Sequence, residues 1–78
     1  MSQSTSHHLG FIRKYELALR YFPDSPSKKA ATDNLTRAIN RCTPLLDELK
    51  RLPGGYNVRE KTYTPQQTHL IYKYLGEP

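Results

Sequence analysis

Apolar residues recur at helical spacing in four segments of this chain, and polar or charged residues fill the positions between them. This pattern predicts helices over residues 14–22, 26–41, 44–52 and 65–75. In the longest segment the apolar residues fall at i, i+4, i+7, i+8 and i+11, so they share one face. They are Ala31, Leu35, Ala38, Ile39 and Cys42. Because alanine is small, this face is expected to pack closely against another helix, the first one.

Ser/Thr-Pro dipeptides mark the predicted starts of the last three helices, at Ser25-Pro26, Thr43-Pro44 and Thr64-Pro65. The hydroxyl can accept a hydrogen bond from an unpaired N–H of the first turn, and proline has no N–H to leave unpaired there. Thr64-Pro65 also forms a capping box, because Gln67 can reach back to the N–H of the cap residue. The helices are therefore expected to begin at residues 26, 44 and 65.

Prolines and glycines mark the predicted helix ends, at Pro23, Pro53-Gly54-Gly55 and Gly76. The segment 56–63 is aromatic, β-branched and charged, with weak alternation, which favours an extended arm or a single strand pairing near Phe11-Ile12. The predicted fold class is mainly α. It is a compact four-helix single domain with one short extended or two-strand β element, resembling a winged helix-turn-helix.

Residues 1–10 are polar and lack periodicity, so they are expected to form a disordered N-terminal arm before a single helical domain over residues 11–78. His7-His8 in this arm lacks the further ligands that a metal site needs, so no metal is expected. No apolar run is long enough to cross a membrane, and the single Cys42 excludes an internal disulfide. The expected setting is the cytoplasm.

Twelve Lys and Arg against seven Asp and Glu give a net charge of +5, and the basic residues are scattered from Arg13 to Lys73. Such scatter indicates a basic surface assembled by folding, and the first hypothesis is a non-catalytic DNA-binding or regulatory module. The candidate nucleic-acid-binding residues are Lys28, Lys29, Asn34, Arg37, Asn40, Arg41, Arg59 and Lys61. Asn34, Arg37 and Asn40 are the candidates for base edges. The alternative is a solvated helix face with ion pairs Lys29–Asp33 and Asp33–Arg37.

The second hypothesis is a protein-interaction or homodimeric assembly module, because six tyrosines in 78 residues exceed what a small core can bury. Its contact surface would carry Tyr56, Tyr63, Tyr72 and Tyr74. Dimerisation would also add stability to a thin core. RNA binding, with bases stacking on tyrosine beside Arg59 and Lys61, is a variant of the first hypothesis that no strand-pair or GXXG motif supports.

No motif indicates an enzyme, so no catalytic residue, cofactor or small-molecule substrate is expected. His69 has no nucleophile and orienting carboxylate at a matching spacing. Asp47 and Glu48 point about 100° apart on an exposed helix and do not form an acid–base pair. Cys42 lies on the apolar stripe, which indicates a small buried hydrophobe, and Gly54-Gly55 is only a helix terminator.

Several short motifs resemble those of the small Bacteroidales proteins grouped as domain of unknown function 4248, over residues of about 11–78. They are Glu16-Leu17-Ala18, Tyr21-Phe22-Pro23, Gly55-Tyr56, Arg59, Thr64-Pro65-x-Gln67, Ile71 and Leu75-Gly76-x-Pro78. The resemblance implies a fold and no activity. The chain departs from the family pattern at Tyr15, where a hydroxyl cap is common, and near Arg37-Ala38, where an aromatic is expected.

A looser likeness relates the chain to the helix-turn-helix modules of excisionase and MerR-type regulators. It rests on Glu16-Leu17-Ala18, on Gly55-Tyr56-x-x-Arg59 and on Tyr63-Thr64. The predicted third helix, which comes between the helix-turn-helix and the expected wing, departs from that pattern.

Overall fold

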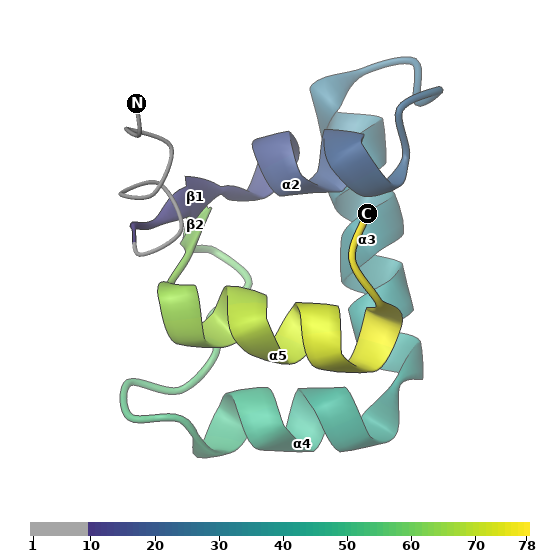
Figure 1. Ribbon diagram of the computed structural model, residues 1–78. Coiled ribbons are helices and arrows are strands. Elements are labelled where there is room, and N and C mark those ends of the chain that lie inside the picture. The colour runs from purple at the N-terminus through teal and green to yellow at the C-terminus, as the bar shows by residue number, and fades with distance from the viewer. Residues whose placement is uncertain (1–9) are drawn as a thin grey trace, which may run out of the picture.

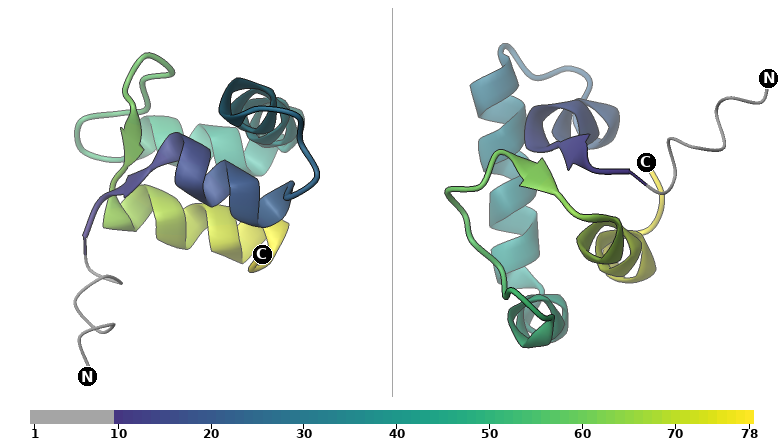
Figure 2. Two further views of the ribbon diagram at one scale, coloured as in Figure 1. Left: turned by 90° about the horizontal axis from the view of Figure 1, so that it is seen from above. Right: turned by 90° about the vertical axis from the view of Figure 1, so that its left-hand side faces the viewer.

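The computed structural model describes residues 10–78 as four helices and two short strands. In chain order they are β1 (Ile12–Arg13), α2 (Lys14–Tyr21), α3 (Lys28–Arg41), α4 (Thr43–Arg51), β2 (Thr62–Tyr63) and α5 (Pro65–Leu75). Helices α2, α5 and α4 run alongside one another, and α3 runs crosswise to them at one end (Figures 1 and 2). The mainly helical fold class, with a two-strand element, is confirmed. The predicted arm and His7-His8 lie outside these residues, apart from Gly10.

The core forms where α3 meets the other helices, and the predicted stripe supplies its centre. Ala31, Leu35 and Ile39 are fully buried, whereas Ala38 and Cys42 are half-buried. The other buried apolar residues come from α2, α4, β2 and α5: Leu17, Ala18, Leu45, Leu49, Tyr63, Leu70 and Ile71. Helix α2 makes the most extensive contact with α3, as the alanines predict.

The two strands pair antiparallel, with Ile12 opposite Tyr63 and Arg13 opposite Thr62. The Lys14 N–H donates to the Lys61 carbonyl at 2.9 Å and continues this ladder into α2. The predicted pairing near Phe11-Ile12 is therefore confirmed. Most of segment 56–61 is a turn rather than a strand, because the Asn57 side chain accepts the Arg59 N–H at 2.9 Å and its carbonyl accepts the Glu60 N–H at 3.1 Å.

The capping box at α5 is confirmed in both directions. The Gln67 N–H donates to Thr64 Oγ1 at 3.1 Å, and the Thr64 N–H donates to Gln67 Oε1 at 2.8 Å. Gly76 follows the helix with φ of 83°, a left-handed conformation that suits glycine at a helix end. The sequence signals therefore give both ends of α5 correctly.

The predicted caps Ser25 and Thr43 are wrong, and the reason is local. Ser27, extended at φ −156° and ψ 165°, caps α3 instead, accepting the Ala30 N–H at 3.0 Å. At α4, Cys42 both ends one helix and begins the next. Its N–H donates to the Ile39 carbonyl at 3.1 Å, and its carbonyl accepts the Leu46 N–H at 3.0 Å. Helix α4 therefore starts at Thr43, with no separate residue left to cap it.

Within residues 10–78, no helix combines the length and the apolar character needed to cross a membrane.

Candidate nucleic-acid interface

One face of α3 is covered by no other element and carries charged and amide side chains. Lys29, Asp33, Arg37, Asn40 and Arg41 are all exposed. They lie opposite the buried stripe because α3 has 3.6 residues per turn. In Figure 1, α3 stands at one end of the molecule, crosswise to the other three helices.

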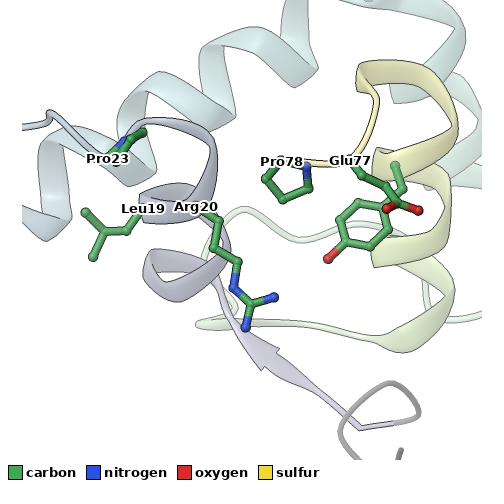
Figure 3. A pocket seen from close by; sticks show the side chains of 6 residues that line it. Leu19, Arg20, Pro23, Glu77 and Pro78 are labelled. Atoms are coloured by element: carbon green, nitrogen blue, oxygen red, sulfur yellow. The ribbon is translucent and has the colours of Figure 1, made fainter. Parts of the chain in front are cut away.

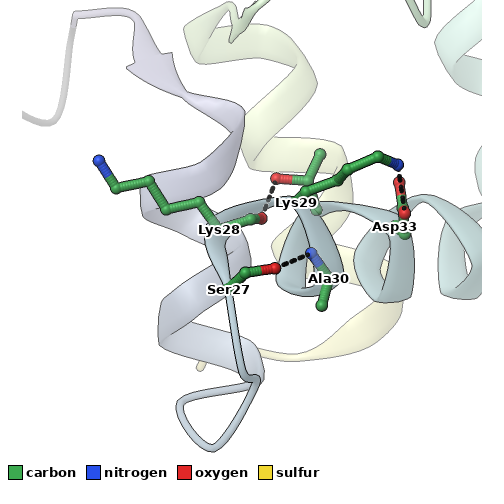
Figure 4. A network of polar contacts seen from close by, with 6 residues as sticks. Ser27, Lys28, Lys29, Ala30 and Asp33 are labelled. Carbon is green, nitrogen blue, oxygen red and sulfur yellow. Dashed lines mark hydrogen bonds and ion pairs between the residues drawn. The ribbon is translucent and has the colours of Figure 1, made fainter.

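The two cations in the first turn of α3 make contacts within the protein, and Figure 4 shows one of these contacts, Lys29–Asp33. Lys29 Nζ lies 3.0 Å from Asp33 Oδ2, which confirms that predicted ion pair. Both side chains are well exposed, at 84% and 52%, so the pair adds about 0–1 kcal/mol to stability. Lys28 Nζ lies 4.4 Å above the ring centroid of Tyr15 on α2. The charges of this end of α3 are therefore partly engaged.

The last turns of α3 carry free cations. Within residues 10–78 Lys29–Asp33 is the only ion pair, so Arg37 and Arg41 have no carboxylate partner there, and the predicted pair Asp33–Arg37 is absent. Arg37 and Arg41 are one helical turn apart, and Asn40 lies between them on the same exposed side. Guanidinium and amide groups can pair bidentately with guanine and adenine edges. This triplet is called the α3 patch below.

The other candidate residues lie elsewhere. Asn34 is half-buried and lines a pocket of about 380 Å³ beside the turn between α2 and α3. Arg59 and Lys61 are exposed on the loop before β2, at the end of the molecule opposite α3 (Figures 1 and 2). The eight predicted residues therefore form two separate groups rather than one face.

Beneath the Arg59 loop lies a buried lysine that sequence reasoning missed. Lys14 is only 6% exposed, and its Nζ donates to the carbonyls of Asn57 at 3.1 Å and Val58 at 3.4 Å. The same Nζ lies 5.3 Å and 5.2 Å from the ring centroids of Tyr56 and Tyr63. Burial lowers the pKa of Lys14, and the nearby Glu60 partly opposes this shift. The available signal was position, because Lys14 lies three residues before Leu17 on the apolar side of its helix.

The two tyrosines around Lys14, Tyr56 and Tyr63, are too buried to form the protein-contact surface predicted for them. Tyr63 is fully buried and Tyr56 half-buried, and both buried hydroxyls lack a hydrogen-bond partner within residues 10–78. Burial raises the pKa of both phenols. Their rings pack against the Lys14 ammonium, so both tyrosines belong to the interior of the molecule beside the strand pair β1–β2.

Comparison with family models matches residues 8–78 to the Domain of unknown function (DUF4248). The chain belongs to this family. The resemblance drawn from the short motifs is therefore confirmed. No match is found among curated proteins or among solved structures.

Two further tyrosines of the DUF4248 protein, Tyr21 and Tyr74, hold its C-terminal helix against the neighbouring helices. The Tyr21 hydroxyl donates to the Gly76 carbonyl, and the Tyr74 hydroxyl donates to a Glu48 carboxylate oxygen. Burial, with smaller effects of Tyr72 and Glu77, raises the pKa of Tyr21 to about 12. The hydrogen bond to Glu48 raises the pKa of Tyr74. These contacts tie α5 to α2 and to α4.

Half-buried Tyr72 lines an open groove of about 550 Å³ between the end of α2 and the C-terminus. Figure 3 places Leu19, Arg20 and Pro23 on one side of it, and Glu77 and Pro78 on the other. Within residues 10–78 of the DUF4248 protein, no three His, Cys, Asp or Glu side chains gather as metal ligands would. The side chains that line the groove are both polar and apolar.

Proposed function

We propose that this DUF4248 protein is a non-catalytic, cytoplasmic DNA-binding module that contacts the duplex through the α3 patch. The observation that carries the proposal is the open face of α3, where Arg37, Asn40 and Arg41 project from a helix whose opposite side is buried. Cations without carboxylate partners can neutralise phosphates at the lowest cost, because no existing ion pair has to be broken. The amide and guanidinium groups would then read base edges.

The dimensions of α3 suit the major groove. Its 14 residues extend about 21 Å, and a groove about 12 Å wide admits one helix. Helix α2 supports α3 from the opposite side. The six residues 22–27 join them, whereas a helix-turn-helix uses a turn of about three or four. The likeness to excisionase and MerR-type modules therefore supports the placement of a helix in the groove. It does not extend to the short turn between the two helices of those modules.

The deciding experiment is binding to a mixed-sequence duplex at about 50 and 200 mM salt. Each phosphate contact contributes about −0.9 to the slope of log K against log salt. We expect the double variant Arg37→Gln with Arg41→Gln to lose two phosphate contacts. The slope should then become less negative by about 1.8, and binding at low salt should weaken.

The matched control is Lys50→Gln with Arg51→Gln, which removes the same charge from exposed positions at the end of α4. It should leave the slope nearly unchanged if α3 is the interface. A flat salt response of the wild type, or equal losses in the two double variants, would contradict the proposal.

A protein-interaction module is the second candidate, and the groove lined by Tyr72, Leu19 and Pro23 favours it. Tyrosine beside apolar side chains is typical of protein contact surfaces. If two copies associate through this groove, sedimentation at micromolar concentration should change on dilution. A concentration-independent monomer would remove the homodimer version of this candidate.

A further inference from the structure

Phe11 is an aromatic residue that the fold leaves in water. Within residues 10–78, Phe11 and Val58 are the two large hydrophobic residues that are exposed, at 68% and 62%. Phe11 directly precedes β1, and Val58 lies in the turn before β2. A phenyl ring at this exposure adds little to the core, so its surroundings decide whether it has another role.

The surroundings of Phe11 form a small groove on the outer face of the strand pair. Tyr63 points into the core, so its neighbour Thr62 projects to the opposite side. Phe11, Pro53, Asn57 and Thr62 line this groove together with the Gly54-Gly55 turn, and its volume is about 230 Å³. Drug-sized ligands occupy pockets of roughly 300 Å³ and more, so this groove suits a single planar ring.

Three cations lie on the segments that border the groove, although none of them lines it. Arg13 lies opposite Thr62 in the strand pair, Lys61 directly precedes Thr62, and Arg59 lies in the same turn. All three side chains are exposed. Glu60, the one acidic residue of segment 56–63, lines the groove. Its carboxylate lies near enough to Lys14 to favour the charged form of the Lys14 ammonium. Glu16 accepts the Arg13 N–H at 3.3 Å, so three cations stand against two carboxylates around the groove, and the local charge is weakly positive, which favours an anionic backbone.

The turn that carries Arg59 and Lys61 is held in place before any ligand arrives. Lys14 Nζ donates to two carbonyls of this turn, at 3.1 and 3.4 Å. The backbone N–H of Lys14 donates to a third, that of Lys61, at 2.9 Å. Gln67 Nε2 donates to the Gly55 carbonyl at 3.3 Å on the other side of the groove. A surface fixed in this way loses little conformational entropy on binding.

We infer that this ribbon surface, made of Phe11, Arg13, Asn57, Arg59, Lys61 and Thr62, binds single-stranded nucleic acid. One base stacks on the Phe11 ring in the groove, and the flanking phosphates meet the three cations. An aromatic platform beside cations is the arrangement by which proteins bind single strands without a sequence code. The inference does not depend on the α3 patch, the proposed duplex contact, which lies at the opposite end of the molecule.

The test uses fluorescence anisotropy with a labelled oligothymidylate of about 20 nucleotides, at about 50 mM salt. Phe11→Ala should weaken its binding roughly 5- to 100-fold, the loss of one stacked base, and Phe11→Tyr should retain it. Val58→Ala removes an exposed apolar side chain that cannot stack and should leave the affinity unchanged. Arg59→Gln with Lys61→Gln should reduce the salt slope by about 1.4.

A mixed-sequence duplex measured in parallel separates this inference from the proposed function. Phe11→Ala should leave duplex binding unchanged, and Arg37→Gln with Arg41→Gln should leave oligothymidylate binding unchanged. Oligouridylate compared with oligodeoxyuridylate, which lacks only the 2′-hydroxyl, distinguishes RNA from DNA as the preferred strand, and tight binding of either supports the surface.

Three results would overturn the inference: no oligonucleotide binding at low salt, wild-type affinity in Phe11→Ala, or equal losses in Phe11→Ala and Val58→Ala. If Phe11→Ala changes only the sedimentation of the protein, the ring belongs to a contact between copies. Phe11 is exposed, so its removal should leave the helical circular dichroism intact, and that spectrum checks the fold of every variant.

Discussion

The two ends of this molecule hold their basic side chains by different physical means. At one end, the α3 patch projects from a regular helix whose other side is buried through Ala31, Leu35 and Ile39. At the other end, Arg59 and Lys61 stand on a turn whose carbonyls are bound by a single buried cation, Lys14. Similar surface charges can therefore be supported by a distributed apolar core or by one buried polar residue. The consequences of mutation should differ accordingly.

The largest effect should come from the core beneath α3. Leu35→Ala should destabilise the whole domain by about 2–5 kcal/mol, because a fully buried side chain leaves a cavity. Chemical denaturation followed by circular dichroism measures this loss. Asn40→Ala, on the exposed side of the same helix, should change stability by no more than about 0.5 kcal/mol. Equal effects of the two variants would mean that α3 is not anchored by its stripe.

An intermediate and local effect should follow from Lys14→Met. This variant keeps the aliphatic stem and removes the ammonium, so the Asn57 and Val58 carbonyls lose a donor at a cost of about 1–3 kcal/mol. Hydrogen exchange should speed up at the Glu60 amide, which donates to Asn57, and should stay unchanged in the middle of α3. Uniformly faster exchange would contradict a local role, because it would make Lys14 part of the global core.

The smallest effect should come from the cap of α3. Ser27→Ala removes the hydroxyl that accepts the Ala30 N–H and should cost about 1 kcal/mol. Ser25→Ala is the matched control and should be nearly neutral, because α3 does not begin after Ser25. Thermal denaturation of the two variants measures the difference. A larger loss from Ser25→Ala would place the start of α3 where the Ser-Pro signal first suggested.

Much of the fold could be predicted because its signals are local. The stripe of α3 and the Thr64 capping box depend on spacing within one segment, and the structure confirms both. The other two caps could not be predicted from Ser/Thr-Pro alone. Ser27 competes with Ser25 for the same role, and Cys42 serves two helices at once.

The arrangement of the candidate residues could not be predicted in the same way. Periodicity places Arg37 and Arg41 on the outside of their helix, but it does not specify where Arg59 lies relative to them. That depends on how α4 and the following turn carry the chain across to the far end of the molecule. The burial of Lys14 was also hidden, because it results from a turn 43 residues further along the chain closing over it.

The one-residue corner at Cys42 has a mechanical consequence. Since its N–H ends α3 and its carbonyl begins α4, no flexible linker separates the two helices. The nine residues of α4 extend about 14 Å from this corner and contact α5, so a tilt of α3 should also move α4 against α5. A spectroscopic label at the far end of α4 should therefore report movements of α3, a helix that the label does not contact.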